Sequence, residues 1–172
     1  YKMLYNRREL KDVRKMTDKD YTPGGMTALL DAVGRTIHKM DMVSGIHRKD
    51  KGNKVLFVII TDGEENDSKE YTYADVKKLI KDRQENAGWE FIFLGANIDA
   101  AAAAENLGID RDRAVKYKNT GSGVRANFKA VAELSDSLAK SGRVSDRWKE
   151  TVEKDEDDAA DKQSAAVTSH RR

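Results

Sequence analysis

The chain has 172 residues, of which 38% are hydrophobic and 36% charged, and its formal net charge is +2 at pH 7. This length allows one domain with a substantial core, and the mixed charges give no basic footprint for nucleic acid. The absence of cysteine excludes disulfides, thiol catalysis and zinc–thiolate sites. Because the longest apolar run is far shorter than a membrane span and no signal-like segment is evident, we expect a cytoplasmic protein with no membrane partner.

The first part of the chain predicts one short strand and one helix. Segment 2–5 alternates polar and apolar residues, which is typical of a half-exposed strand. A turn signal, YTPGGMT, follows at residues 21–27 and contains the only proline. From Thr27 onwards, apolar residues recur at the spacing of an amphipathic helix. These residues are Leu29, Leu30, Val33, Ile37 and Met40.

Strands and helices alternate along the rest of the chain. Apolar runs predict strands at 55–60 and 89–96, and Val115 with Tyr117 marks a shorter third strand. Helices are predicted at 72–86, where Thr72 and Asp75 stand at capping-box spacing, and at 99–107 and 124–140. Strands that are apolar on both faces indicate an α/β fold, a Rossmann-like three-layer sandwich with a mainly parallel sheet.

The apolar periodicity fades after Gly142. The final segment is rich in charged residues, including the run EKDEDDAAD. Segments that bury little apolar surface tend to remain disordered. We therefore expect one α/β domain over residues 1–142 and a charged, flexible tail over 143–172.

One segment, VLFVIITDGEEN at residues 55–66, runs from an apolar strand directly into a cluster of carboxylates. Burying ionised groups is costly unless they are paired or bind a metal. Asp62, however, comes directly after the strand, and ligand sites of parallel sheets lie beyond the carboxyl ends of their strands. Asp62 is therefore a candidate binding residue, although Asp-Gly is also ordinary turn chemistry.

Three segments together resemble a von Willebrand factor type A domain of the stand-alone bacterial or phage sort. They are YTPGGMTALLDAVG, VLFVIITDGEEN and WEFIFLGANIDA, and the resemblance covers about residues 1–140. That family binds a divalent cation, usually Mg²⁺, at a metal-ion-dependent adhesion site formed by three loops. The resemblance implies that Thr27 and Asp62 are metal ligands, and that the acidic side chain of a protein partner completes the shell. Hydroxyl and carboxylate oxygens suit such a hard cation.

A partner-binding rim is expected around this site. Gly24 and Gly25 would let their loop approach closely and adopt positive φ, and Gly63 could do the same beside Asp62. Glu64 and Glu65 are interpreted as a solvated acidic part of the rim rather than as metal ligands. Thr27 could also cap the helix that begins there, and its hydroxyl could serve both roles.

The chain also departs from the family pattern. No Asp-x-Ser-x-Ser motif occurs, and the opening segment resembles the family's third strand, so that the first and second strands are missing. We expect that the sequence is incomplete at its amino end, or that another polypeptide fills the gap. A half site of Thr27 and Asp62 would bind Mg²⁺ weakly, since Mg²⁺ sheds its water reluctantly.

Other site chemistries are less well supported. The segment NTGSGVR at 119–125 resembles a phosphate-cradling loop before a helix, but it lacks the Lys-Ser/Thr of a P-loop. No Gly-x-Ser-x-Gly motif and no histidine beside an acid–base pair are found, so we expect no enzymatic activity. Two functions stay open: a protein-binding module with a divalent-metal site, and a structural or scaffold component of a phage particle or multiprotein assembly with a degenerate, metal-free site. The second would be virion-associated if the protein comes from a phage.

Overall fold

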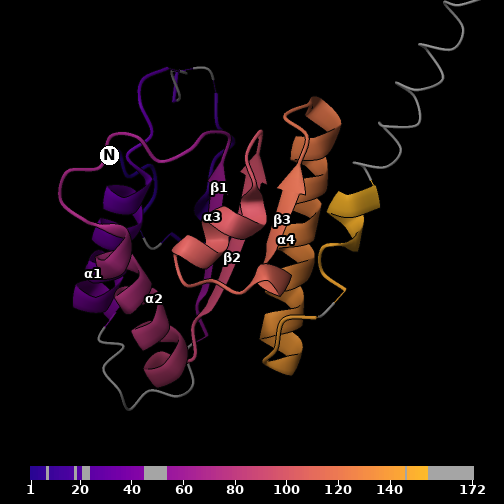
Figure 1. Ribbon diagram of the computed structural model, residues 1–172. Helices are drawn as coiled ribbons and strands as arrows, with labels where there is room; N and C mark the ends of the chain where they lie inside the picture. The colour runs from indigo at the N-terminus through magenta and orange to yellow at the C-terminus, as the bar shows by residue number, and fades with distance from the viewer. Residues whose placement is uncertain (7, 18, 21–23, 45–53, 146, 155–172) are drawn as a thin grey trace, which may run out of the picture.

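Figure 1 shows the computed structural model, which describes residues 1–6, 8–17, 19–20, 24–44, 54–145 and 147–154. In chain order the elements are η1 (Leu10–Asp12), α1 (Leu29–Ser44), β1 (Leu56–Thr61), α2 (Tyr73–Ala87), β2 (Glu90–Ala96), α3 (Ala100–Asn106), η2 (Arg111–Arg113), β3 (Ala114–Tyr117) and α4 (Gly121–Ser141). The strands and helices predicted from residue 27 onwards are confirmed to within a few residues at each end.

The three strands form one parallel sheet in the order β1-β2-β3. The register pairs Leu56 with Glu90 at one end of β1 and Thr61 with Gly95 at the other, and pairs Ala96 with Tyr117. The carboxyl ends of the strands therefore meet at one edge of the sheet. This confirms the α/β class and is compatible with a Rossmann-like fold, although three strands do not specify a particular family.

Helices cover both faces of the sheet. Successive side chains of a strand point to opposite faces, and both faces carry apolar residues that pack into a core. Phe91 and Phe93 of β2 face a core that α1, α2 and α3 complete, whereas Ile92 and Leu94 face a core completed by α4. In Figure 1 the sheet accordingly stands between α1 and α2 on one side and α4 on the other. Among the described residues, no helix is both long enough and apolar enough to cross a membrane.

The opening segment differs from the prediction, because residues 2–5 form no strand. These residues lie against α1 instead. The Tyr1 hydroxyl is 3.1 Å from the Thr36 hydroxyl, and Lys39 Nζ is 3.0 Å from Met3 Sδ. A strand needs a neighbour to accept its backbone hydrogen bonds, and α1 offers only side chains at its surface.

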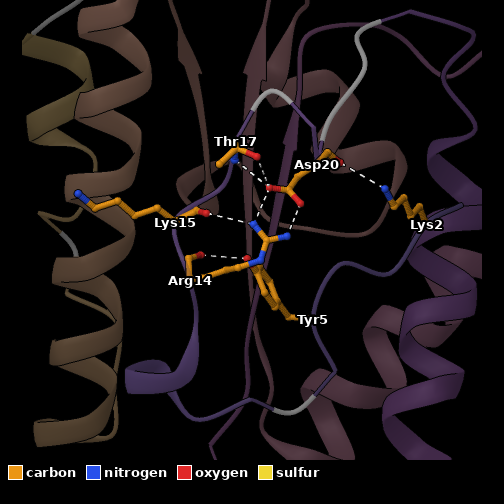
Figure 2. Close-up of polar contacts among 6 residues, drawn as sticks. All are labelled: Lys2, Tyr5, Arg14, Lys15, Thr17 and Asp20. Carbon is orange, nitrogen blue, oxygen red and sulfur yellow. Dashed lines mark hydrogen bonds and ion pairs between the residues drawn. The ribbon is translucent and has the colours of Figure 1, made fainter.

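An ion pair closes the loop that follows this segment, as Figure 2 shows. The guanidinium of Arg14 donates to both carboxylate oxygens of Asp20, and Thr17 donates to the same carboxylate through its N–H (2.8 Å) and its hydroxyl (3.0 Å). Tyr5 donates to the backbone oxygen of Arg14 at 3.0 Å. Arg14, helped by Thr17, holds the pKa of Asp20 far below its ordinary value. The amino-terminal loop is thus tied by side chains rather than by strand pairing.

Within the first part of the predicted tail, three described residues pack against the sheet. Val144, Trp148 and Val152 belong to the same core as α4, and Trp148 is only 2% exposed. The indole N–H of Trp148 donates to the backbone oxygen of Asp112 at 3.0 Å. These apolar residues are spaced by four among charged neighbours, so the composition of the segment hides them. The rest of the predicted tail, 155–172, lies outside the described residues.

Candidate metal and partner-binding site

The segment Asp62–Thr72, which we call the rim loop, follows β1 and leads into α2. The loop begins with a turn in which the Thr61 hydroxyl donates a hydrogen bond to the backbone oxygen of Gly63 at 2.9 Å. The loop then crosses to the start of α1. Thr27 N–H donates to Asn66 Oδ1 at 2.7 Å, and Asn66 N–H donates to the Thr27 oxygen at 3.0 Å. The residues before α1 and those after β1 are therefore joined at the carboxyl edge of the sheet.

Glu65 connects the rim loop to the first turn of α1. One carboxylate oxygen accepts from Leu30 N–H (2.9 Å) and the Ser68 hydroxyl (2.8 Å), and the other accepts from the N–H groups of Asp67 (3.0 Å) and Ser68 (2.8 Å). Burial alone would raise the pKa of Glu65. The four hydrogen bonds have a larger combined effect in the opposite direction, so the pKa of Glu65 lies below its ordinary value. Glu65 thus accepts from one N–H group in the first turn of α1, which needs an acceptor, and from groups of its own loop, so its carboxylate is engaged rather than solvated as the sequence suggested.

Asp31 makes a second connection in the opposite direction. It lies in the first turn of α1, is 6% exposed, and accepts hydrogen bonds from the N–H groups of Lys69 (3.0 Å), Glu70 (2.9 Å) and Tyr71 (3.0 Å). These bonds, the one from Lys69 first, lower the pKa of Asp31. Sequence reasoning missed this residue. The available signal was an acidic side chain directly beside Leu30 in an apolar stripe, since an ionised group there needs partners.

The hydroxyl of Thr27 is not used to cap α1. The N–H groups of Leu30 and Asp31 donate to Glu65 and to the Ser68 hydroxyl instead, and the Thr27 hydroxyl has no hydrogen-bond partner within the described residues. This oxygen lies 3.2 Å from the point that a Cβ on Gly63 would occupy. The lack of a side chain at Gly63 therefore leaves the Thr27 hydroxyl free beside the residue that follows Asp62.

Asp62 is exposed, and within the described part of the chain its carboxylate has no hydrogen bond and no ion pair. Its charge, together with burial as the larger cause, raises the pKa of Tyr117 at the end of β3. Asp62 directly follows Thr61, the last residue of β1, and so stands at the carboxyl edge of the sheet. A free hydroxyl and a free carboxylate are oxygen donors of the kind that Mg²⁺ prefers.

The protein supplies few further ligands at this place. No group of three or more acidic or histidine side chains that could hold a metal ion occurs among the described residues. Thr27 and Asp62 would thus contribute only part of a coordination shell, with water as the remainder. Mg²⁺ commonly keeps several waters in protein sites.

The other predicted rim residues have distinct roles. Gly24 and Gly25 have φ of 128° and 95°, so their expected positive φ is confirmed, whereas the positive φ expected at Gly63 is wrong. An added Cβ at either would meet nothing within 4 Å, so the expected close approach is not found. Glu64 is exposed and, among the described residues, forms no hydrogen bond or ion pair. It borders a cavity described below.

The segment NTGSGVR is a helix start rather than an open cradle. The Thr120 hydroxyl caps α4 by accepting from Gly123 N–H at 3.2 Å. A Cβ at Gly123 would come within 2.1 Å of the Lys118 oxygen, so this glycine is required by close backbone packing. The cap and the packing together account for the residues of this turn without a phosphate ligand.

Comparisons of the chain with family models, with curated proteins and with solved structures found no match.

Proposed function

We propose that this chain is a protein-binding module of the von Willebrand factor type A kind. In this proposal, Thr27 and Asp62 hold a divalent cation, Mg²⁺ by its chemistry, and an acidic side chain of a protein partner takes a free coordination position. The observation that supports it best is that both oxygen groups lie at the carboxyl edge of a parallel sheet and that neither forms a hydrogen bond or ion pair with another described residue.

The surroundings of the two residues also support this function. Glu65 and Asp31 fix the rim loop to α1, so the Gly63 backbone and the Thr27 hydroxyl are positioned before any cation binds. A site that is already ordered loses less entropy on binding than one that must order itself. The bound cation would supply positive charge for the partner's carboxylate, and the carboxylate of Asp62 would balance part of that charge.

The test uses Mn²⁺ as a paramagnetic probe of the same chemistry. We expect Mn²⁺ to broaden the amide signals of Thr27 and Gly63 at sub-stoichiometric concentration, and an excess of Mg²⁺ to restore them. Asp62→Asn and Thr27→Val should each abolish the selective broadening. Asp110→Asn removes an exposed carboxylate elsewhere and should not change it. Equal broadening in wild type and both site variants would refute the metal site.

The second candidate function is a scaffold component with a metal-free site. It is favoured by the incomplete ligand set among the described residues and by β1, which pairs only with β2 there and leaves Ile60 45% exposed. Elemental analysis of the purified protein distinguishes the two candidates. A protein that carries no divalent metal and shows no Mn²⁺ effect would favour the scaffold.

A further inference from the structure

A cavity of about 240 Å³ lies beside the rim loop, between that loop, α3 and the start of α2. Cavities that accept cofactors or drug-sized ligands usually measure about 300–1,000 Å³. This one is too small for such a ligand and large enough for a single side chain. Its apolar lining residues are buried or half-buried. They are Leu29, Phe93, Ile98, Ala102, Ala103 and Leu107.

The mouth of this cavity is acidic. Glu64, Glu65 and Asp99 line it, and its described lining includes no lysine or arginine. Glu65 accepts from Leu30 N–H, and Asp99 accepts from Ala102 N–H at 3.0 Å. Glu64 is exposed and has no partner among the described residues. Burial, followed by the charges of Glu65 and Glu64, raises the pKa of Tyr73 at the same mouth. Glu64 therefore supplies an unpaired negative charge above an apolar interior.

We propose that this cavity receives a lysine side chain of a protein partner. A lysine has an apolar stem that packs along apolar walls and a charged end that stays near water, which matches the walls and the carboxylate of Glu64. The carboxylate of Glu64 could pair with either basic side chain, and lysine fits better than arginine by shape, because its compact ammonium is carried on a slim stem whereas a guanidinium is a broad plane and the cavity measures only about 240 Å³. The proposal rests on the proposed function only in taking this edge as a partner-binding surface.

The cavity and the candidate metal site share one stretch of backbone. Gly63 lines the cavity and also lies against the Thr27 hydroxyl. A partner that places a carboxylate on the cation would thus place neighbouring side chains near the mouth at Glu64. The geometry favours a partner surface in which an acidic residue and a lysine stand side by side.

The test is an NMR titration of the ¹⁵N-labelled chain in EDTA with two probes. N-acetyl-lysine-N-methylamide carries the stem and the ammonium, and N-acetyl-norleucine-N-methylamide carries the alkyl chain alone. We expect saturable shifts at the amides of Gly63, Ile98 and Ala103, with the lysine probe bound several-fold more tightly. An absence of saturable shifts, or equal affinity for the two probes, would overturn the proposal.

Three variants distinguish the contribution of the Glu64 charge from the contribution of the cavity's shape to probe binding. Glu64→Gln should weaken the lysine probe about two- to fivefold, as expected for one exposed charge pair, and leave the norleucine probe unchanged. Ala102→Leu should abolish binding of both probes by filling the cavity, and leucine is a good helix former, so its amide spectrum should stay dispersed. Glu85→Gln removes an exposed charge on α2 outside the cavity and should behave as wild type. A Glu64→Gln variant with unchanged lysine affinity would contradict the role of Glu64.

The metal site and the cavity can fail independently. The titration contains no free divalent metal, so its result does not depend on cation binding. Asp62→Asn should lose the Mn²⁺ effect and keep the lysine probe, which would separate an error in the proposed function from an error in this inference.

Discussion

At the residue scale, Asp31 and Glu65 use their carboxylates to hold backbone N–H groups across the gap between α1 and the rim loop. Hydrogen bonds to the ionised form stabilise it and lower its pKa. A group whose pKa is lower in the folded state adds stability that is present above its unfolded pKa and is lost as the pH falls through its folded pKa. The two carboxylates should therefore make the protein sensitive to acid.

We expect the free energy of unfolding to fall as the pH is lowered from about 5 towards 3, a range that spans the ordinary pKa values of Asp and Glu and extends towards their lowered values in the folded state. Asp31→Asn should be less stable than wild type at pH 7 and should lose less stability on acidification, because its amide cannot ionise. Urea unfolding at several pH values measures both effects. Glu85→Gln is the control, and an identical pH dependence in Asp31→Asn and wild type would be the contrary result.

Sequence reasoning could place Asp62 at the carboxyl edge, because the order of strands and helices fixes where strand ends lie, whereas Thr27 was assigned to the same site only through the resemblance to the von Willebrand factor type A pattern. It could not find the partners of Asp31, which are separated from it by 38 to 40 residues. It misread Glu65 for a related reason. An acidic residue in a polar loop has the same local pattern whether it faces water or the start of a distant helix.

At the scale of helices and strands, the features predicted best from the sequence are those that depend on residues close together in the chain. The capping box of α2 forms as its spacing indicates, with Asp75 N–H donating to the Thr72 hydroxyl and Thr72 N–H donating to the Asp75 carboxylate. Both groups lie within one turn, so no distant residue is needed. The contact of α1 with Tyr71 is different, since a Cβ on Gly34 would come within 2.6 Å of the Tyr71 ring.

Gly34→Ala tests this contact. Alanine favours a helix interior by about 1 kcal/mol over glycine, but overpacking a core contact costs about 1–3 kcal/mol. We expect a net loss of stability in urea unfolding. The same change made in a Tyr71→Ala background should instead be neutral or stabilising, because the ring is gone. A stabilising effect of Gly34→Ala in the wild-type background would show that the ring moves aside without cost.

At the scale of the whole molecule, the second face of the sheet depends on residues beyond the last predicted helix. Val144, Trp148 and Val152 cover that face together with α4. Sequence reasoning gave the sheet class and the helical layers correctly. It did not identify these three residues as part of the core, because a stripe of three apolar residues in a charged segment is too short to establish periodicity.

Trp148→Ala measures what this segment contributes. Replacing a buried Trp or Phe by alanine costs about 3–5 kcal/mol, a large part of the 5–15 kcal/mol that stabilises an ordinary domain. We expect a clearly lower midpoint of thermal unfolding. Trp148→Phe should keep most of the packing and lose the hydrogen bond to Asp112, so its loss should be smaller. A wild-type midpoint in Trp148→Ala would mean that the segment adds nothing to the fold.

The crossing of backbone hydrogen bonds between α1 and the rim loop has a dynamic consequence. The amides of Leu30 and Asp31 donate to the loop, and the amides of Lys69, Glu70 and Tyr71 donate back to the helix. If the rim loop and the start of α1 separate, backbone N–H groups on both segments lose their hydrogen-bond acceptors. The start of α1 and the loop should thus open and close as one cooperative unit, and a molecule bound at either should slow hydrogen exchange in both.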